Sequence, residues 1–306
     1  MNMYDETMRD IILQEGNEQR FNRKHIDAKI RTAIEASLPM QAKMLQGIEL
    51  VKAYLTGQYY ASKMKRIAQL QDMDIAAMVM DIFIGVAYYQ RQELFTSASS
   101  QIAARLKFSD RAEAIATAAE LMAVLCNTDS FDISKESKTA SLMVQSRIPL
   151  SESLLAFMEN SQFLPPMVCE PLELSHNFSS GYLTHNDSLL LGSGNHHDGD
   201  LCLDVLNTMG QVALKLDVDF LSTLEEEPTF ALDTQDKVDG WKAFKTQSYA
   251  MYTLLATQGN RFHFNHKVDK RGRIYSSGYH INPQGTAFKK AMLEFANEEL
   301  VEGVPT

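Results

Sequence analysis

The pattern of apolar and polar positions in the first half of the chain predicts helices. Residues 41–60 and 62–70 are apolar at helical spacing and polar on the opposite side, and Leu38-Pro39 precedes them as a helix-start signal. Residues 74–89 are apolar almost all round, with Asp81 as their only interior charge. This stretch is too short to span a bilayer, so it predicts a buried central helix.

Capping and composition predict three more elements before residue 161. Ser109-Asp110 is a favourable N-cap for an alanine-rich helix over residues 111–126. In residues 127–149, Ser, Asp and Lys surround a β-branched segment, which predicts a small hairpin or loop. A short helix is expected over residues 152–160.

The second half is mixed. The prolines within residues 163–167 predict an extended stretch, and residues 182–184 and 189–191 predict a hairpin about 185–188. Two longer helices are predicted beyond it, and the last segment alternates as strand, turn, strand and helix. These elements are predicted at residues 200–224, 237–259, 261–268, 274–282 and 284–297. The expected fold is therefore mainly α with a small α/β region at the C-terminus.

Composition narrows the class of protein. With 306 residues and 45% hydrophobic content, the chain can bury a large core, which excludes bulk disorder. The acidic N-terminus lacks the basic and apolar regions of a signal peptide. Cys126, Cys169 and Cys202 are far apart and odd in number, which excludes a disulfide framework and indicates a reducing cytoplasm.

Charge is unevenly distributed around the formal total of −10. Between Asp198 and Gly240, eleven acids face two lysines, a net charge of −9. Between Arg261 and Lys290, seven bases face Asp269 alone, a net charge of +6. Because phosphate contacts respond to local potential, the acidic total does not exclude nucleic-acid binding at the basic stretch.

The sharpest candidate for chemistry is the segment Asp269-Lys270-Arg271-Gly272-Arg273-Ile274-Tyr275, where two predicted strands meet. Arg273 offers a planar fork of donors that suits a phosphate, and Asp269 could hold that fork across the turn. Gly272 has no side chain to obstruct a ligand. A solvated turn with a surface ion pair is the alternative interpretation of the same residues.

Residues 262–290 resemble the start of the palm domain of the bacteriophage-type (T7-like) single-subunit RNA polymerases. The family pattern is an aromatic strand, then Asp-x-x-Gly-Arg, an aliphatic residue and Tyr, followed by an Asn-Pro-Gln-Gly turn and a lysine-bearing helix. The matching positions are Phe262 to Asn265, Asp269, Gly272, Arg273, Ile274, Tyr275, Asn282 to Gly285 and Lys290. Pro165 to Val168 with Pro171, and Ser180 to Tyr182, are similar to segments that precede the thumb helices in that family.

The resemblance implies four parts. These are a helical N-terminal domain over 1–160, an extended or hairpin connector over 161–199, thumb-like helices over 200–260, and the start of a palm over 261–306 that a partner chain completes. The resemblance also implies that Arg273 holds a phosphate of the template in the RNA–DNA hybrid, and that Asp269 and Gly272 shape the turn. It implies a further template contact by Lys290, with Arg271 and Tyr275 as neighbours of less defined role.

Phosphoryl transfer on a nucleotide needs two carboxylates that hold two magnesium ions about 3.5–4 Å apart. No aspartate follows Asp269. The chain is therefore expected to be the N-terminal subunit of a two-chain DNA-directed RNA polymerase, which is a nucleotidyltransferase. As an isolated chain it is expected to be inactive. A second subunit would supply the aspartates and Mg²⁺. Other expected partners are the DNA template, the RNA transcript and a single-stranded DNA-binding or recruiting factor. The expected location is the cytoplasm of an infected bacterial host, and no membrane is expected as a partner. The alternatives are a regulatory protein derived from a polymerase fragment and a piece of a longer chain.

Other candidates have simpler explanations. Within residues 196–200, Asp198 or Asp200 is expected to cap a helix rather than bind metal with the neighbouring histidines. His263 and His266 should point to opposite faces of a strand, and Asp217 with Asp219 should lie on a solvated helix surface. A basic helix face could touch upstream DNA but is more simply solvated; it comprises Arg20, Arg23, Lys24, Lys29 and Arg31 around Asp27.

Overall fold

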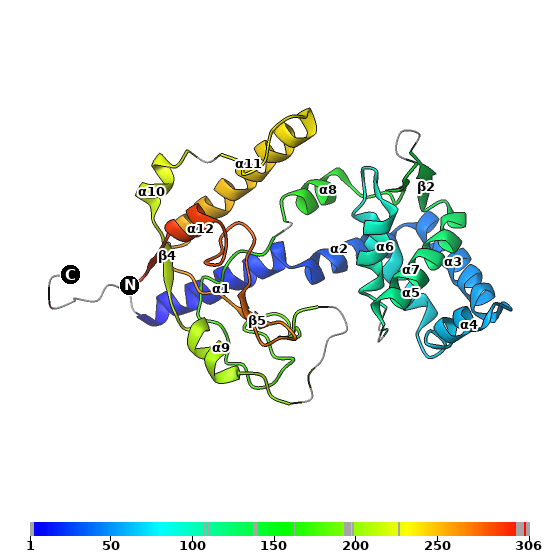
Figure 1. Cartoon of the computed structure of the whole chain (residues 1–306), viewed down its shortest axis with the longest axis horizontal. Coiled ribbons are helices and arrows are strands. Elements are labelled where there is room, and N and C mark those ends of the chain that lie inside the picture. Colours follow the sequence, from blue (N-terminus) through cyan, green and yellow to red (C-terminus); the bar gives the residue numbers. More distant parts are fainter. Residues whose placement is uncertain are drawn as a thin grey trace. The chain divides into compact units, whose positions relative to one another are not determined.

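The computed structural model describes residues 3–106, 108, 110–136, 140–161, 163–192, 197, 199–225, 227–297 and 303. Helices dominate and strands are short, so the predicted fold class, mainly α with small sheets, is confirmed (Figure 1). Packing separates two compact units: Met1–His25 with Asn160–Thr306, and Ile26–Glu159. The four-part division implied by the resemblance stays a prediction. No helix in the described part of the chain is long and apolar enough to cross a membrane.

The unit formed by Ile26–Glu159 is built around the buried helix α5. Its N-cap, Asp74, accepts hydrogen bonds from the backbone N–H groups of Ala76 (2.8 Å) and Ala77 (3.1 Å), which satisfies donors that a helix start leaves open. Phe83 is fully buried at its centre, so the predicted central helix is confirmed. The helices of this unit are α2 (Arg23–Ala36), α3 (Leu38–Thr56), α4 (Ala61–Ala68), α5 (Ile75–Ala87), α6 (Phe95–Ala103), α7 (Arg111–Leu125), the 3₁₀ helix η1 (Cys126–Thr128) and α8 (Glu152–Glu159).

The predicted start of α7 and the predicted hairpin are also confirmed. The Asp110 carboxylate accepts from the Glu113 N–H at 2.8 Å, whereas Ser109 lies outside the described residues. Strands β2 (Phe131–Lys135) and β3 (Leu142–Ser146) pair antiparallel, and β1 (Glu93–Leu94) joins the free side of β3. The sheet order is therefore β1-β3-β2.

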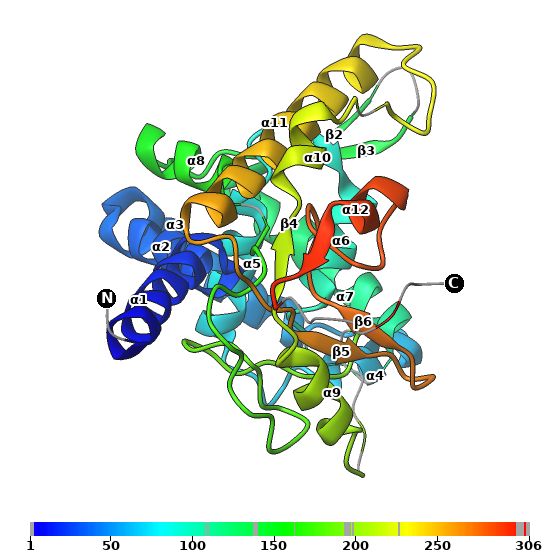
Figure 2. The same cartoon turned by 90° about the vertical axis from the view of Figure 1, so that its left-hand side faces the viewer.

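The second unit packs short strands against helices from both ends of the chain. Phe262, Leu255 and Met292 are among its most buried side chains, and Phe21 of α1 belongs to the same core. Its elements are α1 (Met3–Phe21), α9 (Leu203–Gly210), β4 (Leu214–Leu216), α10 (Val218–Thr223), α11 (Gln235–Thr257), β5 (His266–Val268), β6 (Ile274–Ser276), α12 (Ala287–Ala291) and β7 (Leu293–Phe295). Figure 2 shows β5 and β6 side by side.

Two predicted helices of this unit are wrong. Residues 200–224 are divided by β4, and the predicted helix 284–297 ends at Ala291 and continues as β7. The two strands pair antiparallel, with Leu214 opposite Phe295 and Leu216 opposite Leu293. Each segment gains backbone hydrogen bonds from a strand far along the chain, and this tertiary pairing overrides local helix preference.

The predicted hairpin about residues 185–188 is also wrong. Its second arm pairs with β5 instead, because the Leu191 N–H donates to the Val268 carbonyl at 2.8 Å and the Val268 N–H donates to the Leu189 carbonyl at 2.8 Å. Its first arm is held by a carboxylate of α1, that of Glu18.

The carboxylate of Glu18 is fully buried and anchors residues 183–184. It accepts the backbone N–H groups of Leu183 (2.9 Å) and Thr184 (2.8 Å) and the side-chain amide of Gln14 (2.9 Å). Burial alone would raise the pKa of Glu18. The interactions with His185, Gln14, Thr184 and Leu183 outweigh burial and lower the pKa from 4.5 to about 2. The connector is therefore fixed to α1 by a side chain that is ionised at neutral pH.

Candidate nucleic-acid interface

The segment singled out by the sequence forms a tight turn between β5 and β6. Val268 lies opposite Ile274 in the antiparallel register, and the Asp269 N–H donates to the Arg273 carbonyl at 2.9 Å. The Gly272 N–H donates back to the Asp269 carbonyl at 2.9 Å. Gly272 has φ +79°, in the left-handed region that other residues adopt at a cost, so glycine is required here for backbone conformation.

One carboxylate organises the whole turn. Asp269 accepts from Nε of Arg273 at 2.8 Å, and Nη2 of Arg273 lies 2.7 Å away in an ion pair. Asp269 also accepts from Nε (3.2 Å) and Nη2 (3.0 Å) of Arg271. It also accepts from the hydroxyl of Tyr275 at 3.3 Å. The predicted lock between Asp269 and Arg273 is confirmed, and Arg271 shares the same carboxylate.

Exposure differs sharply between the carboxylate and the cations that it holds. The side chain of Asp269 is 13% exposed, whereas those of Arg271 and Arg273 are 65% and 53% exposed. Loss of solvent acts to raise the pKa of Asp269, but the hydrogen bonds and charge of Arg273 outweigh it and lower that pKa. Hydrogen bonding to Asp269 in turn raises the pKa of Arg273.

Lys270 is exposed, and its side chain makes no hydrogen bond or ion pair in the described part of the chain. Together with Arg271 and Arg273 it gives the turn three cations around one anion. Nη1 of Arg273 lies outside the ion pair with Asp269 and can donate to a ligand. The arrangement suits an anion with several acceptor oxygens, such as phosphate. An ion pair with Asp269 is also expected of a merely solvated turn, so only substitution of Arg273 distinguishes the two interpretations.

The Asn-Pro-Gln-Gly segment supports the turn from the outer edge of β6. The side-chain amide of Gln284 donates to the Ile274 carbonyl at 2.9 Å and accepts the Ser276 N–H at 2.8 Å, as a neighbouring strand would. Asn282 donates to the Ser276 carbonyl at 3.1 Å. The segment ends before α12, whose N-cap position is occupied by Thr286.

These contacts occupy part of the outer edges of β5 and β6. At Ile274 and Ser276 the outer edge of β6 is occupied by Gln284, and at Val268 the outer edge of β5 is occupied by residues 189–191. Edge groups that are already paired cannot accept another strand. Another strand cannot pair at these positions, and completion of the palm by a partner chain stays a prediction.

The remaining basic residues of the segment are placed differently. Lys290 is exposed on α12, and no hydrogen bond or ion pair in the described residues joins its side chain to the turn. Lys267 donates to the Asp187 carboxylate at 2.6 Å. Burial acts to raise the pKa of Asp187, but Lys267 outweighs it and lowers that pKa. This ion pair ties the connector to β5.

The metal and carboxylate-pair candidates do not form sites in the described residues. No group of three or more His, Cys, Asp or Glu side chains there could hold a metal ion, and His196 and Asp198 lie outside the described residues. His263 is buried, and its Nδ1 lies 3.0 Å from the Gly210 carbonyl. Asp217 caps α10 by accepting the Phe220 N–H at 2.8 Å, so it is not half of a carboxylate pair.

Much of the predicted basic helix face is engaged within the protein. Arg31 pairs with Asp81 at 3.1 Å, and Asp27 pairs with Arg105 at 2.9 Å. The ammonium of Lys24 donates to the Asn186 carbonyl at 2.7 Å. Arg31 and Lys24 thus have partners within the protein, which differs from the fully solvated face that was the simpler expectation.

Two side chains that position the turn were not predicted to do so. Gln284 was visible in the sequence only as part of its motif, and Asp187 only as part of a predicted loop. Neither contact could be predicted from local sequence. Each side chain contacts a strand, and the spacing of residues along the chain does not show that this strand lies next to it. The motif was the only available signal for Gln284.

No protein-family model matches the chain. The chain is 30% identical over 152 residues to a probable DNA-directed RNA polymerase of Gelasinospora sp. (strain G114), an alignment that covers 45% of this chain. It spans only 18% of the length of that relative. This similarity supports a relationship to DNA-directed RNA polymerases.

Proposed function

We propose that this chain is the N-terminal subunit of a two-chain, bacteriophage-type DNA-directed RNA polymerase and that the turn at residues 269–273 contacts the template strand. The observation that carries the proposal is the pair of exposed guanidiniums that Asp269 holds at the tip of β5 and β6. The partial similarity to an RNA polymerase and the compound motif from Phe262 to Lys290 support it.

In this proposal each residue of the turn has one task. Arg273 donates to a template phosphate through the part of its guanidinium that Asp269 does not hold, and Arg271 and Tyr275 stand beside it. Asp269 and Gly272 set the shape of the turn. Lys290 adds a contact to the same strand as a point charge.

The residues described here do not fit the two-magnesium centre of a polymerase. Asp269, the carboxylate of the turn, already accepts from two arginines and a tyrosine, and no metal-binding group of side chains occurs in the described residues. We therefore assign the catalytic aspartates and Mg²⁺ to a second subunit that carries the rest of the palm and the fingers. DNA template, RNA transcript and a single-stranded DNA-binding or recruiting factor complete the proposed assembly, in the cytoplasm of an infected bacterium.

The test is reconstitution with the second subunit. We expect the purified chain alone, with Mg²⁺, all four nucleotides and a template, to make no RNA. Co-purification with the second subunit should restore template-dependent synthesis, because the metal-binding carboxylates are then present. RNA synthesis by the single chain would contradict the division of labour, and a second subunit that is fully active alone would contradict the need for this chain.

The distribution of charge gives a second expectation. Cross-linking of the assembled polymerase to DNA should label peptides from residues 261–290 and spare those from 198–240, because phosphate is attracted to local positive potential and repelled by the acidic block. The measurement is mass spectrometry of the cross-linked peptides. Labelling concentrated in the acidic block would reverse the assignment.

A further inference from the structure

Helix α11 is packed along only half of its length. It has 23 residues, or about 35 Å at 1.5 Å per residue, and its buried residues, from Ser248 to Leu255, all lie in the C-terminal half. Figures 1 and 2 show the N-terminal half extending away from β4 and α12. Val238, Trp241 and Phe244 nevertheless continue the spacing of the buried side at helical intervals. These three residues form the α11 face.

Apolar rings gather on this face, where Trp241 and Phe244 are themselves partly buried and the rings around them are more exposed. Trp241 stacks on Phe244 at 5.4 Å between ring centroids and meets the edge of Phe230 at 6.2 Å. Phe230 is 49% exposed, and Tyr279, which packs against Phe244 at 6.0 Å, is 48% exposed. A cluster of aromatic side chains that is half open to water is typical of the anchor region of a protein–protein interface.

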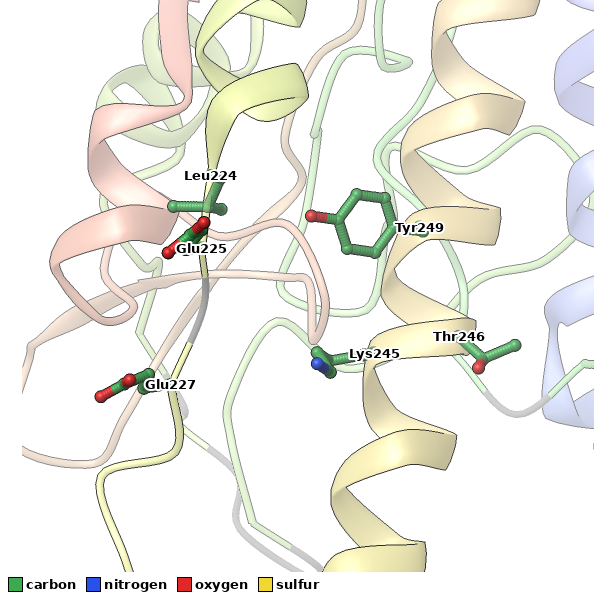
Figure 3. A pocket seen from close by; sticks show the side chains of 6 residues that line it. All are labelled: Leu224, Glu225, Glu227, Lys245, Thr246 and Tyr249. Atoms are coloured by element: carbon green, nitrogen blue, oxygen red, sulfur yellow. The ribbon is translucent and has the colours of Figure 1, made fainter.

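Acidic groups border the α11 face. Between residues 225 and 240, six acids oppose Lys237 alone, and Lys237 is itself paired with Asp233 at 2.7 Å. Figure 3 shows a pocket between the linker that follows α10 and the side of α11. It has a volume of about 510 Å³, and its lining includes Glu225, Glu227 and Tyr249 together with one cation, Lys245, so two carboxylates outnumber a single ammonium there. Both glutamates are exposed and have no ion-pair partner in the described residues.

We propose that the α11 face and this pocket bind the second polymerase subunit, through a surface of that subunit that presents an apolar side chain beside a basic one. The inference rests on the proposed function, since it names where that subunit docks. An apolar residue of the partner would cover Trp241, and a Lys or Arg would enter the pocket between Glu225 and Glu227. Nucleic acid is disfavoured here because phosphates would meet the carboxylates. A second copy is disfavoured because it would bring the same acidic border.

The only tryptophan of the chain lies at the centre of this face, which makes the proposal directly measurable. The chain labelled with fluorotryptophan gives one fluorine NMR resonance, from position 241. We expect this resonance to shift and to lose its response to a soluble paramagnetic quencher when the second subunit is added. An RNA–DNA hybrid oligonucleotide, or raising the concentration of the chain itself, should leave the resonance unchanged.

Substitution tests the same contact through affinity. Trp241→Ala should weaken binding of the second subunit about thirtyfold, as expected for an aromatic anchor. Glu225→Gln combined with Glu227→Gln should weaken it less and reduce its dependence on salt. Phe178→Ala, which removes a ring that is 58% exposed elsewhere in the same unit, is the control and should bind normally.

The outcomes separate this proposal from the one on which it rests. The docking site would be wrong if the two subunits formed a stable, active complex while the Trp241 resonance did not move and Trp241→Ala bound normally. The proposed function would then still stand. A resonance that shifts only with the oligonucleotide, or only on self-association, would overturn the docking site in favour of those occupants. Failure of the two subunits to associate at all would overturn both proposals.

Discussion

Arg273→Ala is expected to lower RNA synthesis by the assembled polymerase about ten- to a hundredfold while leaving the complex intact. The change removes a charged donor to a template phosphate beside the reacting groups. The turn itself should survive, because Asp269 keeps its hydrogen bonds with Arg271 and Tyr275 and the backbone bond from Gly272 is unchanged. A run-off transcription assay, with subunit association measured in parallel, checks both parts.

Two further variants separate a template contact from a solvated ion pair. Arg273→Lys should recover only part of the activity, since an ammonium cannot both pair with Asp269 and present a planar fork to a phosphate. Lys270→Ala removes a neighbouring exposed cation at a position that the family pattern leaves free, and it should be nearly silent. If Arg273→Ala and Lys270→Ala behaved alike in the intact complex, the template-binding role of Arg273 would be wrong.

Glu18→Ala is expected to lower the free energy of unfolding by about 3–5 kcal/mol. The substitution strands the buried N–H groups of Leu183 and Thr184, each of which costs about 1–3 kcal/mol when left without an acceptor, and removes the anion that orders residues 183–184. Denaturant unfolding of the purified chain measures the loss. Glu15→Ala changes an exposed carboxylate of the same helix and is the matched control, with little expected effect.

The same carboxylate gives the wild-type chain a defined acid sensitivity. The pKa of Glu18 is lowered from 4.5 to about 2 in the folded protein, so its stabilising contribution is complete above pH 4.5. That contribution should be lost as the pH falls toward about 2, by up to about 3 kcal/mol. Glu18→Gln should be less stable at neutral pH and should lack this part of the acid dependence. An equal slope in both proteins between pH 4.5 and 2 would contradict the assignment.

The features that the sequence alone determined are those whose partners lie within a few residues. The buried central helix, the cap at Asp110, the hairpin of β2 and β3 and the lock between Asp269 and Arg273 were all predicted and are all present. In each case helical spacing, a side chain three or four residues away, or a short turn contains the stabilising interaction. The motif around Asp269 therefore identified the candidate site before its geometry was known.

The features that only the tertiary structure decided depend on residues distant in sequence. β4 exists because β7 pairs with it, residues 183–184 are ordered by a carboxylate of α1, and the outer edge of β6 is occupied by the amide of Gln284. The sequence of residues 214–216 has no local property that distinguishes the end of a helix from a strand. The segment forms a strand because it pairs with β7, which lies far away along the chain. Backbone donors and acceptors must be satisfied on folding, and which distant group satisfies them is settled only when the chain packs.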